Sequence, residues 1–588
     1  MFGVNLHFYD YLIIAAYFVF SVGIALYYSR RASKNTNEFF LSGRNLPWYL
    51  AGLSMVATTF AADTPLAVTE LVAKNGIAGN WIWWSYAFGG LLTVFFFAKL
   101  WRRAGIMTEA EFAEIRYSGK PARFLRGFRA LYLGLFMNII IMGWVNKAMI
   151  SILVGMFNIP ESEIFFYVFG AMLLVAFYSA LSGLWGVVVT DAFQFVLAMA
   201  GTIVLAVIVV NSSQIGGISG MQEKLPNFVF DFFPSISDVS SAGSVFVLSA
   251  AAFLAYVGIN WWASWYPGAE PGGGGYVAQR MMSAKNEKHS LFATLFFQIA
   301  HYAIRPWPWI LVGLSTLILY PDLAADQKKM GYIYSMNDYL PIGLKGLLVA
   351  AFFAAYMSTI ATQLNWGSSY ILNDFYRRFI KRNESEKHYV GVSRVTTIVL
   401  MIISVFVTFF IERISGAWEF IMEAGAGVGL VLILRWFWWR INAWSEISAM
   451  ITPFIVIPLL KMLKIEFPIS LYYIVPATTV VWLTVTYLTK PTDEKTLIEF
   501  YRKIHPGGFL WKKISANLPG VESDKGFLRM FMNWIFGVVL VYSILFGTGS
   551  LIFGDITPAL IYIFAAIVSI TIIYKNLQHI GWAKLINR

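Results

Sequence analysis

Apolar residues in this chain gather in stretches of about 20, the length that an α-helix needs to cross a lipid bilayer. The pattern predicts an all-α polytopic membrane protein with about 15 transmembrane helices. The predicted spans cover residues 9–29, 47–72, 80–101, 128–157, 161–181, 184–211, 246–266, 290–319, 341–375, 389–412, 416–438, 443–462, 468–488, 527–552 and 557–576. A secretion signal is the alternative for the first span, but a basic cluster follows that span and none precedes it, so we expect an uncleaved helix.

Polar residues and helix breakers interrupt two of these spans. The second span reads LAGLSMVATTFAADTPLAVTELV, and the seventh ends GINWWASWYPGAEPGGGGYVAQR, where prolines and glycines cannot continue a regular helix. The two breaks are an odd number of spans apart, so the second copy would enter the membrane from the opposite side. Spans two to six and seven to eleven are therefore predicted to be inverted repeats, an arrangement typical of transporters. Two kinked helices with packing roles are the alternative.

Composition and charge agree with a membrane protein. Hydrophobic residues make up 58% of the chain and charged residues 13%, with a mean hydropathy of +0.64, whereas soluble domains carry about 25% charged residues. Most of the 44 lysines and arginines lie in alternate loops, which predicts an outside N-terminus and an inside C-terminus. The basic loops are 30–45, 99–129, 267–289, 377–394, 435–440, 488–529 and 575–588. The net charge of +12 then requires no nucleic acid, because basic residues beside spans also meet anionic lipid headgroups.

Several chemistries are not expected from this sequence. The absence of cysteine excludes disulfides, cysteine-ligated metals and thiol catalysis. No GK[ST] follows the glycine run 272–275, and the six histidines show no HExxH, so nucleotide binding and a metalloenzyme are not expected. The intramembrane acids are too scattered for a convergent acid/base set.

Two adjacent hydroxyls, Ser358 and Thr359, lie in the middle of the long apolar stretch 341–375. Oxygen atoms within a membrane are candidate ligands for a small hard cation. The alternative is that both hydroxyls donate back to carbonyls one turn earlier in the same helix.

Five segments resemble the solute:sodium symporters, the family of the sodium/galactose, sodium/proline and sodium/sialic acid transporters. They are FFLSGRNLPWYLAGLSMVATTFAAD, GIMTEAEFAEIRY, SGLWGVVVTDAFQ, VAQRMMSAK and AAYMSTIATQLN, in that order. The resemblance spans roughly residues 9–460 and implies a LeuT-like core of five-plus-five inverted repeats. The implied division is a first helix and cytoplasmic loop (1–45), the LeuT-like transport core (46–440), two further transmembrane helices (441–488), an amphipathic cytoplasmic linker (489–526) and two extra C-terminal transmembrane helices (527–588).

The resemblance also implies a sodium site, called Na2 in this family. Its ligands would be the carbonyls of Ala57, Phe60 and Ala355 and the hydroxyls of Ser358 and Thr359. Some members bind a second sodium, and here Asp191 and Thr362 match two of its ligands, while Ala361 replaces a hydroxyl. A helix-cap or gating role is the alternative for Asp191.

The implied substrate site differs from that of the sugar carriers. The candidate contacts are Thr64, Trp83, Tyr86, Asn260, Trp261, His301, and Trp418 or Glu419. Tryptophan faces can stack on a sugar ring or enclose a cation, and His301 with Arg305 can donate to a carboxylate. The alternatives are interfacial anchoring for the tryptophans and charge pairing within the membrane for Arg305.

The sequence thus predicts a sodium-coupled symporter that imports a small polar organic solute by alternating access, and not an enzyme. A sugar or polyol is favoured; a carboxylate, amino acid or sialic-acid-like solute is the second interpretation, and a non-transporting membrane solute sensor the third. Sodium is the expected coupling ion, with no organic cofactor. The expected partners are the solute, sodium and the lipid bilayer; the oligomeric state is left open, a monomer included. A multi-pass location in a bacterial inner membrane is expected.

Overall fold

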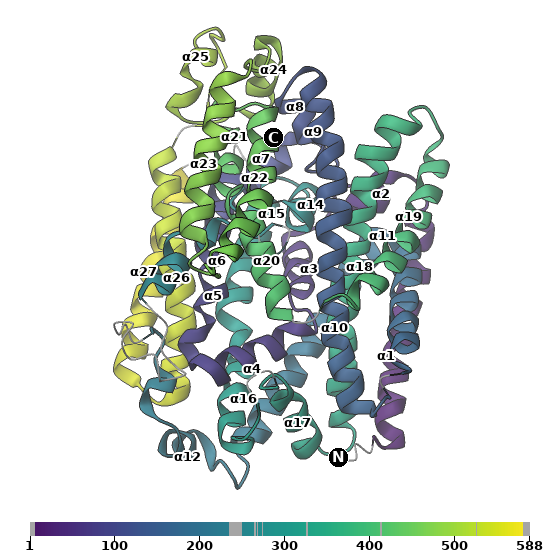
Figure 1. The fold of residues 1–588 in the computed structure, drawn as a ribbon, viewed down its shortest axis with the longest axis vertical. Coiled ribbons are helices and arrows are strands. Elements are labelled where there is room, and N and C mark those ends of the chain that lie inside the picture. Colours follow the sequence, from purple (N-terminus) through teal and green to yellow (C-terminus); the bar gives the residue numbers. More distant parts are fainter. Residues whose placement is uncertain are drawn as a thin grey trace.

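The computed structural model describes residues 6–579 except 161, 235–249, 264, 265, 267, 273, 325, 326, 412, 413, 522 and 525. Within these residues the chain is almost entirely helical, and the one strand-like pairing is an isolated bridge between Leu46 and Ala284. The predicted all-α class is therefore confirmed. Most of the long helices run along the long axis of the molecule (Figure 1).

The helices follow one another with short connections. The first half of the chain contains α1 (Phe8–Ala32), α2 (Thr36–Leu41), α3 (Trp48–Thr58), α4 (Asp63–Asn75), α5 (Trp81–Trp84), α6 (Tyr86–Leu92), α7 (Ala98–Ala104), α8 (Phe112–Arg116), α9 (Gly119–Leu131), α10 (Asn138–Phe157), α11 (Ile164–Val210), α12 (Gly217–Lys224), α13 (Ala250–Gly258) and α14 (Gly275–Ser283). The second half contains α15 (Glu287–Ile299), α16 (Pro306–Leu319), α17 (Met330–Tyr339), α18 (Leu344–Tyr370), α19 (Glu386–Thr408), α20 (Ile414–Ala426), α21 (Gly429–Phe437), α22 (Ala443–Met462), α23 (Leu471–Leu488), α24 (Glu494–Ile504), α25 (Lys512–Ser515), α26 (Phe527–Phe553) and α27 (Ile556–His579).

Twelve helical segments within the described residues are long and apolar enough to cross a membrane, fewer than the fifteen predicted spans. α11 contains two of the predicted spans, 161–181 and 184–211, which meet at Gly183; the φ and ψ of this glycine are not helical, so α11 is two helices joined at a kink. The two interrupted spans form shorter pieces that do not reach the length of a span. Twelve segments result when α11 is counted once and the two interrupted spans are left out.

Both predicted breaks are present. α3 ends at Thr58 and α4 begins at Asp63, so the backbone leaves the helix over four residues. In the seventh span α13 ends at Gly258, and regular α-helix resumes only at Gly275, after the prolines and glycines. α14 packs against α3, which brings the two broken spans together.

α18 is the central helix of the bundle. Of its most apolar window, 94% is buried inside the protein, compared with 17% for the C-terminal helix α27. It packs against α11, α1, α10, α19 and α3. A polar side chain on α18 therefore meets other helices and not lipid, which makes this helix suitable for a site at membrane depth.

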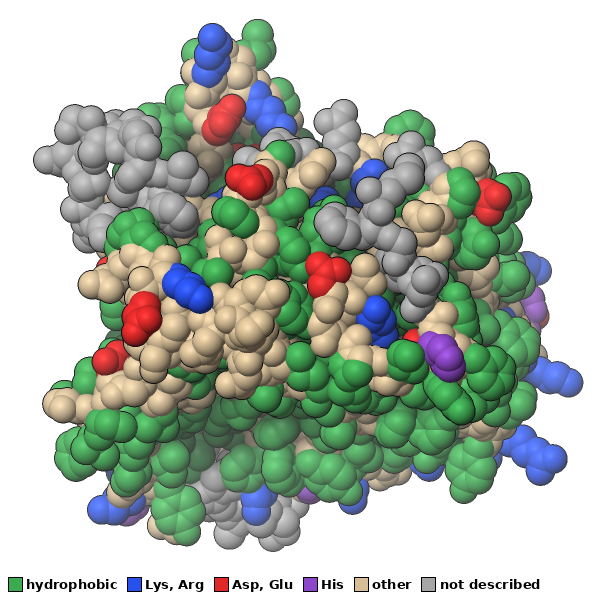
Figure 2. All heavy atoms as spheres, turned by 90° about the horizontal axis from the view of Figure 1, so that it is seen from below, with side chains coloured by type: hydrophobic (Ala, Val, Ile, Leu, Met, Phe, Trp, Pro, Cys, Tyr) green, Lys and Arg blue, Asp and Glu red, His purple; other side chains and the backbone are tan. Residues whose placement is uncertain are grey.

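The loops of the two predicted sides gather at opposite ends of the molecule. α8, α24 and α25 lie at one end, and α12 and α17 lie at the other (Figure 1). The latter end shows charged side chains scattered singly among hydrophobic side chains (Figure 2). The arrangement agrees with the predicted alternation of loops.

The predicted amphipathic linker 489–526 packs onto the end of the bundle. α24 buries Leu497, Phe500, Tyr501 and Ile504, one face of a helix, against α7 and α8. Asp524 pairs with Lys99 Nζ at 2.6 Å and with Arg103 Nη1 at 3.2 Å. Burial alone would raise the pKa of the Asp524 carboxyl, but these two cations outweigh it and hold the pKa below its ordinary value.

The last two helices extend the scaffold. α26 donates two hydrogen bonds of 2.8 Å, from Trp534 Nε1 to the Phe88 carbonyl of α6 and from Tyr542 Oη to the Trp84 carbonyl of α5. α27 then packs on α26 and leaves most of its own apolar surface exposed. α26 therefore flanks α5 and α6, and α27 is attached through α26.

The kink of α11 depends on glycine. Gly183 has φ 55° and ψ −163°, a conformation that other residues rarely adopt, and a Cβ there would lie 2.9 Å from the Phe39 carbonyl oxygen. We expect Gly183→Ala to lower the free energy of unfolding by about 1–3 kcal/mol, measured by unfolding in detergent micelles. Gly170→Ala in the same helix is the control, because a Cβ there meets no atom within 4 Å. Equal stability of the two variants would contradict this account.

Candidate functional site

Thr359 links α18 to the end of the broken helix α3. Its Oγ1 lies 2.8 Å from the Thr58 carbonyl oxygen and 3.2 Å from the Ala355 carbonyl oxygen, one turn back in α18. The simple alternative for this hydroxyl, a bond within its own helix, thus describes only one of its two contacts. The contact with Thr58 places the hydroxyl at the point where α3 leaves helical geometry.

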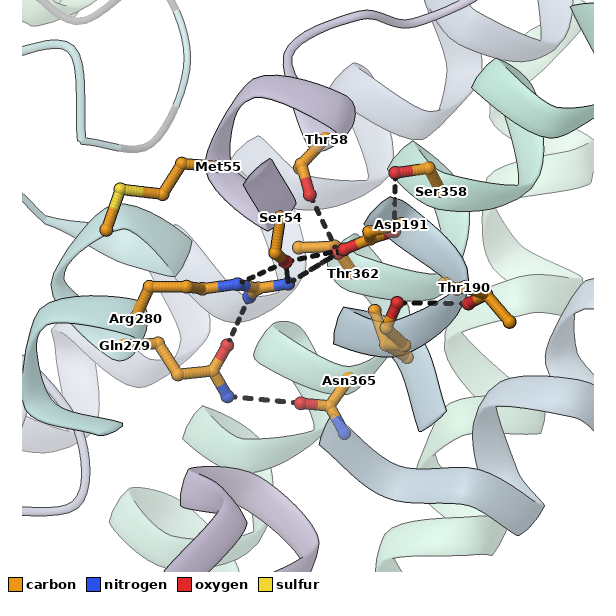
Figure 3. A network of polar contacts seen from close by, with 12 residues as sticks. Ser54, Met55, Thr58, Thr190, Asp191, Gln279, Arg280, Ser358, Thr362 and Asn365 are labelled. Carbon is orange, nitrogen blue, oxygen red and sulfur yellow. Dashed lines mark hydrogen bonds and ion pairs between the residues drawn. The ribbon is translucent and has the colours of Figure 1, made fainter. Parts of the chain in front are cut away.

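Ser358, the neighbouring hydroxyl, turns toward α11. Its Oγ donates to Asp191 Oδ1 at 2.7 Å, and Ser54 Oγ of α3 donates to Asp191 Oδ2 at 2.5 Å (Figure 3). All three side chains are buried. The carboxylate therefore holds hydroxyls from two different helices, α3 and α18.

Arg280 of α14 completes this network. Its guanidinium donates to Thr362 Oγ1 at 2.8 Å and to Ser54 Oγ at 3.1 Å, and its Nη2 lies 3.8 Å from Asp191 Oδ2 (Figure 3). Gln279 Oε1 accepts a further bond at 2.8 Å. Asp191 and Thr362, the predicted ligands of a second sodium, thus lie in one network, and a positive side chain already shares it.

The five predicted Na2 ligands are all buried and lie on α18 and at the end of α3. They are Ala57, Phe60, Ala355, Ser358 and Thr359, each at most 3% exposed. Only carbonyl and hydroxyl oxygens are offered, and within the described residues no group of three or more His, Cys, Asp or Glu side chains could hold a metal ion. Neutral oxygens of this kind fit a monovalent hard cation.

A small cavity lies next to the break between α3 and α4. Its volume is about 40 Å³, whereas ligand pockets commonly measure about 300–1,000 Å³. It is lined by Thr58, Thr59, Ala61, Asp63, Thr64, Ile141, Trp144, Val145, Tyr266, Tyr276, Thr359, Gln363 and Trp418. Because Thr359 belongs to this lining, the cavity adjoins the predicted ion site.

Two of the predicted substrate contacts, Thr64 and Trp418, line the cavity. The side chains of three others bond to protein groups. Tyr86 Oη donates to Asn260 Oδ1 at 3.3 Å, and Trp83 Nε1 donates to Asn80 Oδ1 at 2.8 Å. None of these three side chains, nor Asn80, belongs to the cavity lining.

The remaining candidates are not part of the lining, but His301 contacts two of its residues, Thr59 and Tyr266. His301 Nδ1 is 2.9 Å from Thr59 Oγ1, in a π-helical segment, Ala300–Ile304, between α15 and α16. Trp261 packs against Trp534 of α26, and Glu419 is half-buried on α20. The structure thus gathers only part of the predicted substrate set around one cavity.

Sequence reasoning missed several residues of the lining. Gln363 lies one turn after Thr359, so helical spacing alone could have placed it on the same face. Asp63 directly follows the break, a position that could have marked it as a candidate. Trp144 and Tyr266 carry no signal of this kind, because their position depends on how distant segments pack.

A model of the sodium:solute symporter family matches residues 39–452, more than half of the chain. The chain belongs to this family. Sodium is thus the coupling ion, and the protein is a transporter and not an enzyme.

Relatives within the sodium:solute symporter family transport different solutes. A sodium/glucose cotransporter of Vibrio parahaemolyticus is 25% identical over 79% of this chain and 87% of its own length. A sodium/mannose cotransporter of Bos taurus is 26% identical over 74% of this chain and 75% of its own. A human sodium-coupled monocarboxylate transporter is 26% identical over 63% of this chain and 59% of its own.

A solved structure supports the predicted fold. An outward-open, substrate-bound sodium-coupled sialic acid symporter superposes with a TM-score of 0.66 at 19% identity, over 83% of this chain and all of that one. The predicted LeuT-like architecture is thereby confirmed.

The network around Arg280 makes a testable contribution to stability. Arg280→Gln leaves the buried Asp191 carboxylate without its cation, so we expect the free energy of unfolding to fall by about 3–5 kcal/mol. Adding Asp191→Asn should recover part of this loss, because no charge is then left unpaired. Unfolding in detergent micelles measures the stability of the single and the double variant. Arg123→Gln is the control, because Arg123 is exposed. A single variant as stable as this control would contradict the role of the pair.

Proposed function

We propose that this chain imports a small polar organic solute together with sodium by alternating access, with the solute bound in the cavity beside Thr359. The observation that carries the proposal is the Thr359 contact, because one residue lies both in the cavity lining and at the predicted ion site. Sodium binding would hold α3 and α18 together and order the wall of the cavity. Release of sodium on the opposite side would loosen the same contact.

A sugar or polyol is the favoured solute. The glucose and mannose relatives support it, as do the hydroxyl and amide groups and the tryptophans of the lining. A carboxylate, amino acid or sialic-acid-like solute is second, supported by the monocarboxylate relative. Arg305 does not support it, because its guanidinium donates to the carbonyls of His301 and Val56 and is not part of the lining. Sodium-dependent net uptake would separate either symporter from a solute sensor that binds without transport.

The proposed coupling ion binds at Ala57, Phe60, Ala355, Ser358 and Thr359. We propose one such sodium per cycle, because Arg280 supplies a positive charge to Asp191 and Thr362 where a second ion would otherwise do so. Asp191 then has a structural role, because its Oδ1 fixes the hydroxyl of Ser358.

The remaining proposals concern placement. An outside N-terminus and an inside C-terminus are supported by the basic loops, and a bacterial inner membrane by the Vibrio relative. Residues 46–440 would form the transport core, with 441–488 and 527–588 as accessory helices and 489–526 as the linker docked at the cytoplasmic end. A single copy would suffice for this transport cycle.

Sodium binding can be tested without knowing the solute. Sodium at about 100 times its Kd should stabilise the folded protein by about 2.7 kcal/mol relative to potassium, and Ser358→Ala with Thr359→Ala should abolish this difference. Thermal unfolding of the purified protein measures it. Ser369→Ala is the control, because this buried hydroxyl of α18 donates to the Trp366 carbonyl, away from the site. Unchanged sodium stabilisation in the double variant would refute the assignment of the ion site.

A separate measurement gives the number of sodium ions that bind in each cycle. With one site, the free energy of unfolding of the wild-type protein should rise by about 1.4 kcal/mol for each tenfold increase in sodium well above the Kd. Two required ions would double this slope, and a doubled slope would rule out the single-sodium proposal.

A further inference from the structure

The cavity beside the helix break contains a carboxylate whose bonding is incomplete. Asp63 is the first residue of α4 and is 3% exposed, and its Oδ1 has no hydrogen-bond partner in the described part of the protein. The side chain belongs to the cavity lining. A buried carboxylate without full hydrogen bonding is costly, so a partner from outside the protein would be favoured at this position.

A second acceptor faces the same space. Gln363 of α18 lines the cavity, is 1% exposed, and its Oε1 also lacks a hydrogen-bond partner among the described residues. The two acceptors come from different elements, α4 and α18. Their shared need is for hydrogen-bond donors, which an ionised carboxylate cannot supply itself.

The cavity lining contains no cationic side chain that could pair with Asp63. The thirteen lining residues include neither lysine nor arginine nor histidine. Arg305 lies outside the lining and attracts Asp63 electrostatically. Its hydrogen bonds include those to the carbonyls of His301 and Val56, at 3.1 and 3.2 Å, and within the described residues none joins it to Asp63. The N-terminus of α4 offers Asp63 only the partial positive charge of a helix end.

The walls of the cavity are aromatic. Trp144 of α10, Tyr266 before α14, Tyr276 of α14 and Trp418 of α20 all belong to the lining and are at most 8% exposed. Aromatic faces attract a cation through their quadrupole, most strongly when the site is desolvated. A carboxylate enclosed by aromatic rings is therefore a suitable site for a positively charged group that carries N–H donors.

We propose that the imported solute carries a protonated nitrogen that binds to Asp63 and Gln363 inside this aromatic enclosure, as an amino sugar or an amino alcohol would. This inference rests on the proposed function, and it narrows the polar solute to one with a cationic amine. Its hydroxyl groups would meet the remaining polar side chains, such as Thr64. The carboxylate also offsets the repulsion between this cation and the sodium beside Thr359.

Matched pairs of probes test the charge on the nitrogen. Glucosamine and ethanolamine carry a protonated amine, while N-acetylglucosamine and ethylene glycol are their neutral counterparts. In sodium, we expect at least one amine to raise the melting temperature of the full-length protein, with an apparent affinity about tenfold or more above that of its neutral partner. Equal or tighter binding of the neutral partners, or no binding by either amine, would overturn the proposal.

The Asp63→Asn variant tests the residue itself. It keeps the shape of the side chain and removes the charge, so amine binding should weaken about tenfold or more while stabilisation by sodium alone persists. Glu70→Gln is the matched control, because it removes a carboxylate from the same helix that pairs with Lys74 outside the lining. Unchanged amine binding by Asp63→Asn would refute the assignment; if this variant does not fold, the wild-type probe pairs decide.

The same measurements separate this inference from the proposed function. Sodium-dependent uptake of a neutral solute into proteoliposomes, with no uptake of the amines, would overturn the amine inference and leave the symporter intact. Absence of both sodium stabilisation and sodium-driven uptake of every probe would overturn the proposed function and this inference with it. Sodium-driven uptake of glucosamine or ethanolamine, lost in Asp63→Asn and retained in Glu70→Gln, would support both.

Discussion

A helix that breaks inside a membrane persists only if protein groups satisfy the backbone groups that the break frees, because lipid offers none. This constraint acts at the end of α3. Thr59 Oγ1 lies within 3.0 Å of the carbonyl oxygens of Met55 and Val56, Arg305 adds a donor to Val56, and Thr359 reaches Thr58. Two of these donors come from other parts of the chain. The break is therefore a property of the assembled bundle, and it fixes where α16 and α18 must lie.

The same requirement explains how a structural contact can also serve an ion. The hydroxyl of Thr359 has one proton to donate and lone pairs that remain for a cation. Sodium at the proposed site would coordinate oxygens that otherwise satisfy one another across α3 and α18. The ion would thus replace a hydrogen bond between two helices by coordination to both of them.

Hydropathy, proline and glycine predicted the spans and both breaks, because these properties are local in sequence. The boundary between the spans 161–181 and 184–211 also agrees with the structure, because the kink of α11 lies at Gly183. The close packing of Gly183 against Phe39 was not predictable, because Phe39 is distant in the sequence. At the candidate site, the family resemblance predicted Thr359 as a site residue. It did not predict that Arg280 pairs with Asp191, because that contact depends on how α14 packs near α11 and α18. The sequence also did not predict the direction of side chains. Asn260 Nδ2, for example, donates to the Ile82 carbonyl, and no neighbouring residue in the sequence indicates this contact.

The two buried carboxylates near the helix break, Asp191 and Asp63, differ in how fully protein groups pair with them. Asp191 has Arg280 and two hydroxyls, so its region is complete without a ligand. Asp63 interacts electrostatically with Arg305 but has one oxygen without a hydrogen-bond partner among the described residues, so the proposed amine would complete its hydrogen bonding. Thr359 lines the cavity and is one of the proposed ligands of sodium. If sodium binding orders Thr359 and thereby strengthens binding of the solute, the solute must strengthen binding of sodium by the same free energy, because linkage is reciprocal. The proposed coupling therefore needs no long pathway through the bundle, because both ligands would use the same turn of α18.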